Sequence, residues 1–326
     1  MNIWEAIIQG IVQGLTEFLP VSSSGHLSLV QHILPSTSSG NNDVGNQALS
    51  LFLHFGTLLA VFIVYREVIW KMILEFFSMC KEICTKKFVW KLDQMNKERR
   101  MVIFVVVASA FAIILFLPVL GWMGLETGGE PVKKLSDLAE YFSNDNSILA
   151  EGIFFTFTGI LILLATVFDF RIGNSLKNKD GVITMRNACA MGIGQCIAAM
   201  PGISRSGTTT TMGMLTGAEK NTALEFSFIM GIPAVLAANL LEVKDTDWSS
   251  VSGSTIVAIL VGVVVSAVVG VLAIKFLKWI VSNDKFHYFV NRYLVAGRHL
   301  KQFSGVFFLL FEIYTCPFTG GAGRMP

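Results

Sequence analysis

Two short polar segments interrupt an otherwise apolar chain, and both carry side chains suited to handling phosphate. The first, Val21–His26, contains three consecutive serines, and the second, Gly202–Thr209, places Arg205 between two serines. Hydroxyl groups, the backbone amides that open a helix, and a guanidinium are the groups that bind phosphate oxygens. Together they predict phosphate chemistry at two breaks in an apolar sequence, with a lipid-linked phosphate as the expected ligand.

The approach to the first segment carries a carboxylate in apolar surroundings. Gln13 and Glu17 are four residues apart, so they share one face of a helix that Pro20 ends. An ionisable side chain at such a position costs several kcal/mol, roughly, unless it has a function and a partner. We therefore predict that Glu17 is an acid able to hold a divalent cation. A glutamate that reaches water near a helix end is the alternative.

The serines after this helix predict both a nucleophile and an anion site. Ser22, Ser23 and Ser24 offer three hydroxyl groups, and Gly25 lets the backbone approach a ligand closely. A following helix would point its first amides at the same place. His26 titrates near neutral pH and can carry a proton. A serine helix cap without any ligand is the alternative, but a cap needs one serine rather than three.

The second segment predicts a phosphate clamp. Arg205 lies between two apolar blocks with no acidic neighbour in sequence, and a guanidinium forks onto phosphate oxygens. The alternative partner is Glu17, in a purely structural ion pair. The surrounding residues expected to bind substrate with it are Gly202, Ser204, Ser206, Gly207, Thr208 and Thr209. An acid, a hydroxyl nucleophile, a proton carrier and an arginine clamp together suit phosphoryl transfer.

The composition predicts an all-α integral membrane protein. Only 15% of the 326 residues are charged, whereas a soluble domain averages about 25%. No basic, aromatic-interleaved patch indicates a nucleic-acid partner. The cysteines show no metal-ligand spacing. Six apolar blocks are candidate membrane spans: Ala48–Tyr65, Met101–Trp122, Ile148–Phe168, Leu224–Leu241, Ile256–Ile280 and the shorter Phe303–Cys316.

Two shorter apolar stretches lead directly into the polar segments. Ile3–Leu19 and Ala188–Met200 each run into a proline and then into serine-rich sequence. Because irregular backbone at membrane depth is tolerated only where protein or a watery cavity satisfies it, both are predicted to be re-entrant, broken helices.

The distribution of basic residues predicts the orientation of the spans. Lys81–Arg100, Arg171–Arg186 and Lys275–Lys301 are rich in lysine and arginine, whereas Gly124–Glu151 and Glu242–Gly253 are poor in them. The positive-inside bias makes the first three loops cytoplasmic and the last two external. Six spans with this alternation leave both termini outside.

The two polar segments are related by a constant offset. Five pairs of identical residues stand 182 positions apart: Gly10 and Gly192, Gln13 and Gln195, Ser22 and Ser204, Ser24 and Ser206, and Gly25 and Gly207. Each half, about 1–170 and about 185–318 of one membrane domain 1–326, would hold one broken helix and three spans. An odd number of spans inverts the second half, which predicts an inverted-topology repeat with the site at its centre. Chance similarity of two serine-rich loops is the alternative.

At these residues the sequence closely resembles the bacterial undecaprenyl-diphosphate phosphatases of the bacitracin-resistance type. The resemblance rests on QGLTEFLPVSSSGHL at Gln13–Leu27 and PGISRSGTT at Pro201–Thr209, with weaker matches in LEFSFIMGIPA at Leu224–Ala234 and in GTLLAVFIVYR, which ends at Arg66. It implies hydrolysis of undecaprenyl diphosphate, which recycles the carrier lipid of cell-wall synthesis and confers bacitracin resistance. It also implies a bacterial plasma-membrane protein whose site faces the periplasmic, external side and uses Mg²⁺ or Ca²⁺.

The resemblance also implies residue roles. Glu17, Ser23, His26 and Arg205 correspond to the catalytic residues, and Glu17 with Gln13 corresponds to the acidic pair that binds the metal. Gln13 is an amide where many members have a glutamate, so the metal depends more heavily on Glu17. Whether Ser23 attacks phosphorus or positions water is left open, as is a homodimer. The implied partners are a polyprenyl diphosphate and membrane lipid.

Two other functions compete with this one. A second class of lipid phosphatases uses a histidine nucleophile a few residues after Ser-Arg, but Ser206–Ala218 contains no histidine. A lipid-phosphate transporter or flippase would suit the inverted repeat, although it has no need of Ser23 and His26. We expect His54, inside an apolar span, to be an interior histidine rather than a catalyst.

Overall fold

The protein is helical in almost every part that the structure describes. The structure is a computed structural model that describes residues 2–33, 42–88, 91–116, 181–200, 202–245 and 252–283, and a few residues between these ranges (126–127, 130–131, 134, 137, 154, 156–162, 164 and 248). Strands occur there only as one antiparallel pair of two-residue segments, β1 (Glu126–Thr127) and β2 (Glu130–Pro131). The predicted all-α class is therefore confirmed for the described residues, apart from this short strand pair.

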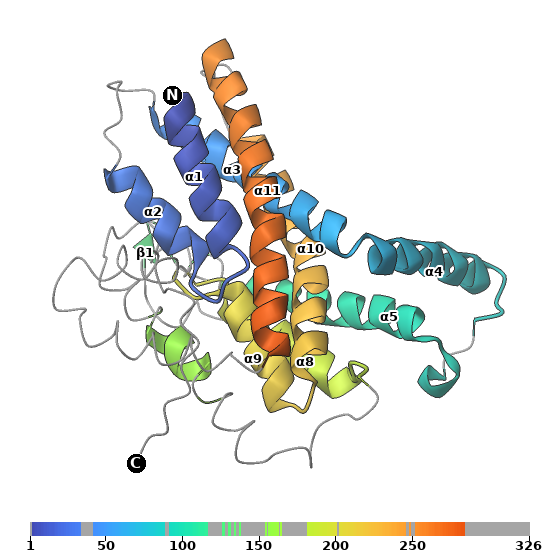
Figure 1. Ribbon diagram of the computed structural model, residues 1–326. Helices are drawn as coiled ribbons and strands as arrows, with labels where there is room; N and C mark the ends of the chain where they lie inside the picture. Colours follow the sequence, from blue (N-terminus) through green and yellow to red (C-terminus); the bar gives the residue numbers. More distant parts are fainter. Residues whose placement is uncertain are drawn as a thin grey trace, which may run out of the picture.

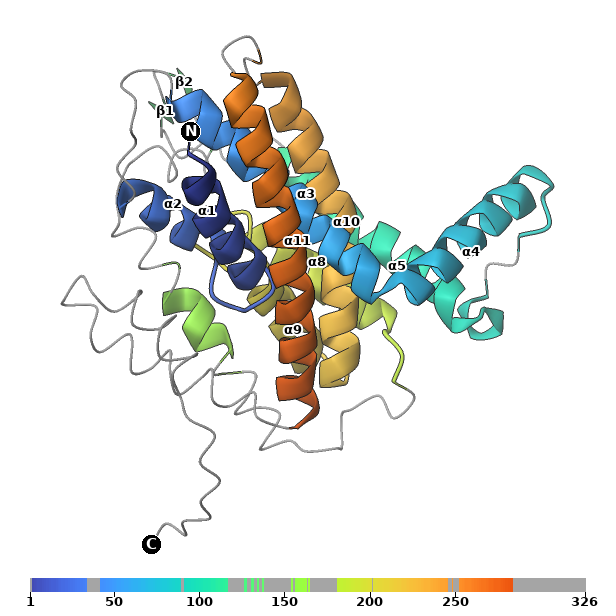
Figure 2. The same ribbon diagram turned by 45° about the horizontal axis from the view of Figure 1, so that its top comes forward.

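Long helices form a bundle from which one helix projects. Figure 1 shows α1, α10 and α11 running side by side, α3 crossing them, and α4 extending away from the bundle, as Figure 2 also shows. The helices are α1 (Ile3–Thr16), α2 (Ser23–Ile33), α3 (Asn42–Val64), α4 (Arg66–Cys84), α5 (Lys97–Ala110), α8 (Met185–Ile197), α9 (Arg205–Leu215), α10 (Lys220–Asp245) and α11 (Gly253–Ser282), with short 3-10 helices at Leu92–Gln94 and Phe111–Phe116.

Three of the predicted spans are helices long and apolar enough to cross a membrane. These segments of α3, α10 and α11 are Gly45–Val64, Lys220–Lys244 and Gly253–Ser282, and they extend the predicted blocks by a few residues at their ends. The predicted span Met101–Trp122 begins within α5 and continues as a 3-10 helix to Phe116, beyond which it lies outside the described residues. Ile148–Phe168 is described only at 154, 156–162 and 164, and Phe303–Cys316 lies wholly outside the described residues.

Helix α4 was not predicted, because its charged residues break every apolar run. Its polar side pairs with α5, where Arg99 donates hydrogen bonds to Glu75 at 3.0 Å and to Glu82 at 2.9 Å. These hydrogen bonds hold the pKa of Glu82 below its usual range. The predicted loop Lys81–Arg100 is thus helical at both ends, and an arginine–glutamate network joins the two helices.

The helices around the two polar segments recur at the offset seen in the sequence. Helices α1 and α8 begin 182 positions apart, and so do α2 and α9. Both α1 and α8 also open with a capping box, at Asn2 and at Thr184, which satisfies the first backbone amides of each helix. The sequence match therefore extends to the local structure that brackets each polar segment.

Two glycines related by this offset allow similar close helix contacts. A Cβ added to Gly10 of α1 would lie 2.8 Å from the carbonyl oxygen of Gly262 in α11. A Cβ added to Gly192 of α8 would lie 2.7 Å from the carbonyl oxygen of Ala108 in α5. Small residues let helix backbones approach in this way, so α1 packs on α11 much as α8 packs on α5.

Replacing the next glycine of α1 tests this close packing. Gly14→Ala would place a methyl group 2.6 Å from the carbonyl oxygen of Ser266. We expect the Tm measured in detergent to fall by about 2–10 °C, because overpacking costs about 1–3 kcal/mol. Gly253→Ala is the matched control, since its Cβ would meet nothing within 4 Å. Equal Tm values for the two variants would contradict the proposed contact.

Candidate active site

A tight turn in the first polar segment brings Ser23 back toward the end of α1. Helix α1 ends at Thr16, and α2 begins at Ser23. Between them Ser22 adopts φ of +60°, a left-handed conformation that costs a residue with a Cβ about 1–2 kcal/mol. This turn reverses the chain, so that the Ser23 hydroxyl meets the Glu17 carboxylate.

Glu17 is the centre of a buried hydrogen-bond network. The Ser23 hydroxyl donates to its Oε2 atom at 2.7 Å, and the Gln13 amide donates to the same atom at 3.1 Å. The other carboxylate oxygen, Oε1, accepts a hydrogen bond from Arg205 Nη2 at 2.5 Å, which completes an ion pair between the two polar segments. Gln13, Ser23 and Arg205, all predicted site residues, therefore meet at the carboxylate of Glu17. Arg205 comes from a segment 188 positions away from Glu17.

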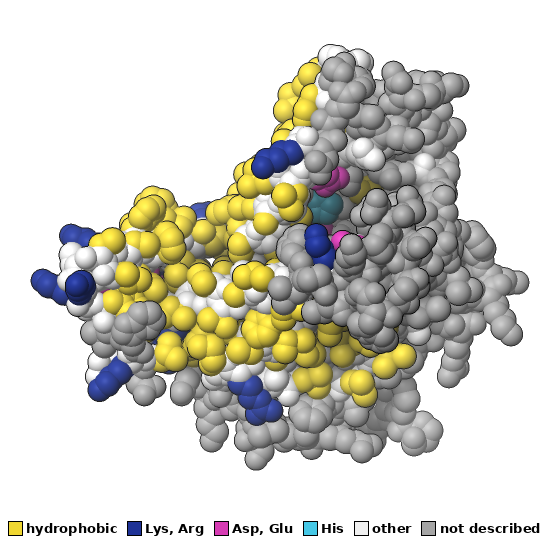
Figure 3. All heavy atoms as spheres, turned by 180° about the vertical axis from the view of Figure 1, so that it is seen from behind, with side chains coloured by type: hydrophobic (Ala, Val, Ile, Leu, Met, Phe, Trp, Pro, Cys, Tyr) yellow, Lys and Arg dark blue, Asp and Glu magenta, His cyan; other side chains and the backbone are white. Residues whose placement is uncertain are grey.

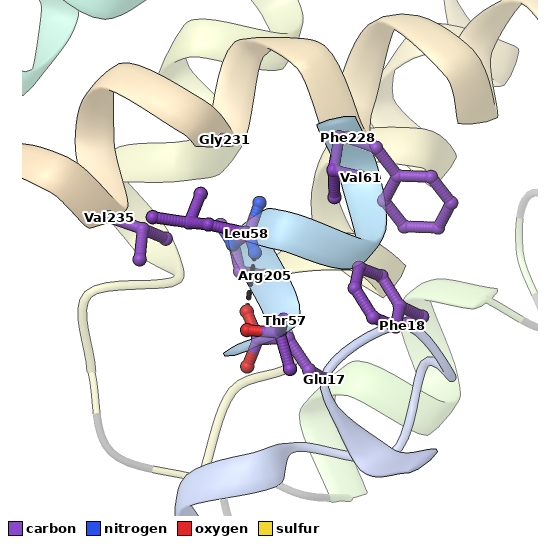
Figure 4. A pocket seen from close by; sticks show the side chains of 9 residues that line it. All are labelled: Glu17, Phe18, Thr57, Leu58, Val61, Arg205, Phe228, Gly231 and Val235. Carbon is purple, nitrogen blue, oxygen red and sulfur yellow. Dashed lines mark hydrogen bonds and ion pairs between the residues drawn. The ribbon is translucent and has the colours of Figure 1, made fainter. Parts of the chain in front are cut away.

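Arg205 reaches Glu17 from the first turn of α9. Ser204 caps this helix through the Gly207 amide, which fixes where Arg205 starts. The guanidinium lies against Gly231 of α10, where it occupies the space that a Cβ would need. In Figure 4 the side chain runs between α3 and α10 to the Glu17 carboxylate. The absence of a side chain at Gly231 is therefore what gives the guanidinium room.

The two polar segments also touch each other directly. The Ser206 hydroxyl donates to the carbonyl oxygen of Leu19 at 3.3 Å, and Gly207 lies so close to Pro20 that an added Cβ would be 3.0 Å from its ring. Within each segment the repeated serines bond to each other: Ser22 to Ser24 at 3.3 Å, and Ser204 to Ser206 at 3.4 Å. The turns thus form one assembled unit rather than two separate loops.

Other predicted residues make contacts of their own within the two polar segments. His26 is buried, and its Nδ1 donates to the Ser22 carbonyl at 2.8 Å. Thr209 uses its hydroxyl to bond Ser227 of α10 at 2.6 Å and the Arg205 carbonyl at 2.8 Å. Thr208 is fully buried, Gly202 adopts φ of +85° in the turn before α9, and Gly25 has only the Ser22 hydroxyl near its Cβ position.

An apolar pocket opens beside the Glu17–Arg205 ion pair. Figure 4 shows the pair at one end of it, with Phe18 and Phe228 together on one side, their rings edge to face at 5.2 Å. The side chains that line the pocket come from the end of α1, from α3, α9 and α10, and they are Glu17, Phe18, Thr57, Leu58, Val61, Arg205, Phe228, Gly231 and Val235. The charged pair therefore lies in a small pocket whose other walls are mostly apolar side chains of α3 and α10.

The structure adds His54 to this site, against the expectation from its sequence. Its Nε2 atom lies 3.9 Å from Glu17 Oε2, and 30% of its side chain is exposed. Ser50, His54 and Thr57 follow helical spacing along α3, a polar line in an apolar span that could have marked the site-facing side. Figure 3 shows acidic, basic and histidine side chains meeting in one hollow of an otherwise largely apolar face.

The donor atoms at Glu17 fit a hard divalent cation only in part. The Gln13 Oε1 atom is buried with no hydrogen-bond partner, which leaves an oxygen acceptor beside the carboxylate. Among the described residues, no three histidine, cysteine, aspartate or glutamate side chains gather into a metal cluster. One carboxylate and one amide oxygen suit Mg²⁺, which commonly takes its remaining ligands from substrate phosphates and water.

Comparison with known proteins shows the family to which the chain belongs. Residues 6–298 match the family described as bacitracin resistance protein BacA. A protein of Alkaliphilus metalliredigens named undecaprenyl-diphosphatase is 34% identical over 93% of this chain and 99% of its own length. Proteins of the same name from Methanobrevibacter smithii and Treponema denticola are 34% and 31% identical over 91% and 92% of this chain, and 96% and 97% of their own lengths. The chain therefore belongs to the bacitracin resistance protein BacA family.

Proposed function

We propose that the protein hydrolyses undecaprenyl diphosphate to undecaprenyl phosphate and inorganic phosphate. The observation that carries this function is the buried Glu17 carboxylate, which accepts the Ser23 hydroxyl and pairs with Arg205 beside an apolar pocket. The family and the names of the relatives supply the substrate. Hydrolysis regenerates the carrier lipid of cell-wall synthesis and counters bacitracin, as the family's name records.

Glu17 and Ser23 form the reacting pair. The hydroxyl proton already points at the carboxylate across 2.7 Å, so Glu17 can accept it as an oxygen attacks the terminal phosphorus. That oxygen belongs either to Ser23 itself or to a water that Ser23 holds. His26, one turn into α2, is the proton carrier that we assign to the reaction. The bond that breaks is the phosphoanhydride, and undecaprenyl phosphate leaves. Where water attacks, inorganic phosphate forms in the same step; where Ser23 attacks, water then hydrolyses the phosphoserine ester and releases inorganic phosphate.

Arg205 holds the phosphate that is transferred. A guanidinium has five N–H donors, and the bond to Glu17 Oε1 uses only one of them. The remaining donors can fork onto phosphate oxygens, where charge-assisted bonds are strongest. The backbone and hydroxyl groups of Ser204 and Ser206 keep the start of α9 in place for this contact. The apolar pocket beside the pair suits the lipid side of the substrate.

A divalent cation, Mg²⁺ or Ca²⁺, completes the site in this proposal. Glu17 and Gln13 would hold it, with the unpartnered Gln13 Oε1 as the available amide oxygen. When bound, the cation neutralises charge on the diphosphate oxygens.

The proposed architecture is an inverted repeat of six spans with two re-entrant segments. Its support is the common offset of α1 with α8 and of α2 with α9, together with the equivalent glycine contacts of Gly10 and Gly192. We propose that the site faces the external side of a bacterial plasma membrane, and the distribution of lysine and arginine supports this orientation.

Substitution of the four central residues tests the proposed chemistry. We expect Glu17→Ala, Ser23→Ala, His26→Ala and Arg205→Ala each to lower kcat/KM for a C55 diphosphate by about 10²–10⁴-fold, measured as phosphate release in detergent. Ser282→Ala and Arg99→Ala are matched controls, because both side chains bond far from the pocket. Full activity of folded Arg205→Ala protein would exclude the phosphate clamp.

Removal of divalent cations tests the metal requirement separately. We expect EDTA to reduce phosphate release by the purified protein to background, and added Mg²⁺ or Ca²⁺ to restore it, because the diphosphate charge is otherwise unbalanced. The control is a chelated sample titrated back with excess cation. Undiminished hydrolysis in EDTA would contradict a cation at this site.

Selective labelling of cysteines tests the orientation. In a cysteine-free background, Cys84 restored alone should react with an impermeant maleimide only after spheroplasts are opened, since α4 should be cytoplasmic. Ser252→Cys, at the exposed start of α11, should react in intact spheroplasts. The reverse pattern would invert the proposed topology.

A further inference from the structure

We propose that His54 is a ligand of the divalent-cation site, joining Glu17 and Gln13, and that the site therefore prefers a cation that accepts nitrogen, such as Mn²⁺, over Ca²⁺. This inference rests on the cation of the proposed function and adds a residue to it. Ca²⁺ takes oxygen ligands almost alone, whereas imidazole suits first-row transition metals.

The hydrogen bond at one nitrogen fixes which tautomer His54 adopts. Nδ1 lies 2.9 Å from the carbonyl oxygen of Ser50, and a carbonyl oxygen can only accept, so Nδ1 carries the proton. In the neutral ring, Nε2 then presents a lone pair. Histidines that bind metals characteristically donate their other N–H to a backbone carbonyl or a carboxylate, which orients the ring and makes it a better ligand.

The separation of His54 and Glu17 fits two ligands of one cation. Nε2 and Glu17 Oε2 are 3.9 Å apart, beyond the range of a direct hydrogen bond. Two atoms that each bind one metal at about 2.1 Å stand about 3–4 Å apart. Oε2 also accepts hydrogen bonds from Ser23 and Gln13, so a cation bound there would take the place of one of these donors.

The surroundings of this gap favour a cation over solvent alone. Gln13 contributes a buried Oε1 without a hydrogen-bond partner, on the same helix face as Glu17. Arg205 binds the other carboxylate oxygen, so the oxygen nearest to His54, Oε2, is not part of the bond to the guanidinium. A cation here would connect the end of α1 to the middle of α3. A proton shared between His54 and Glu17 is the competing arrangement, and it predicts no nitrogen ligand.

Electron paramagnetic resonance of bound Mn²⁺ distinguishes these arrangements. In purified protein freed of any polyhistidine tag, without substrate, we expect electron spin-echo modulation from a directly coordinated imidazole ¹⁴N. His54→Gln should lose this modulation while its amide oxygen partly preserves binding. His54→Ala should weaken Mn²⁺ binding by about 10–100-fold and reduce the preference for Mn²⁺ over Ca²⁺. His26→Gln is the matched control: it removes a neighbouring imidazole and should keep both the modulation and the affinity.

Three results would overturn the assignment: wild-type protein that binds no Mn²⁺, wild-type Mn²⁺ without ¹⁴N modulation, or modulation that survives His54→Gln and disappears in His26→Gln. The first two need no variant, so they do not depend on whether a substitution folds. Failure of the proposed function would give a different result. Wild-type protein would then release no phosphate from the lipid diphosphate, although it would still show the ¹⁴N signal.

Discussion

The structure depends on one requirement: a carboxylate and a guanidinium placed in apolar surroundings must find each other. Glu17 and Arg205 have side chains only 7% and 20% exposed, and they come from segments 188 residues apart. Removing one partner of such a buried pair costs about 3–5 kcal/mol, because the other charge is left uncompensated. Neither half of the chain can bury its own charge alone. Assembly of the two halves and formation of the site are therefore the same event.

Glycines determine where the two halves can pack closely enough for this ion pair to form. Gly10 and Gly192 let α1 and α8 approach their neighbours at backbone distance, which sets the height of the two turns that follow. Gly231 leaves the space on α10 that the Arg205 guanidinium fills. Pro233, two residues later in the same helix, removes one backbone N–H from the ladder of α10. Small residues thus position large charged ones, and the ion pair forms where backbone geometry leaves room for it.

The sequence predicted the chemical groups of the site better than their contacts. Residue types and spacing predicted Glu17, a serine hydroxyl and Arg205 as one set, and the family resemblance selected Ser23 among the three serines. The apolar runs predicted α3, α10 and α11. The partner of Ser23 was not predictable, because it follows from the left-handed turn at Ser22, which no residue pattern indicates. Two other features depend on tertiary structure. Helix α4 is joined to α5 through Arg99, 24 residues from Glu75, and His54 reaches the site through its position on α3.

The charge of the assembled site gives the physical reason for proposing a cation. Glu17 and Arg205 offset each other, and Gln13 adds no charge where a second carboxylate would add one. A diphosphate that enters this neutral site brings negative charge into apolar surroundings, where an unbalanced ion is very costly. The single positive charge of Arg205 is already offset by Glu17, so it does not balance a diphosphate. A divalent cation held by Glu17 would supply positive charge, so that the carboxylate would keep a cationic partner while Arg205 uses its other donors on phosphate.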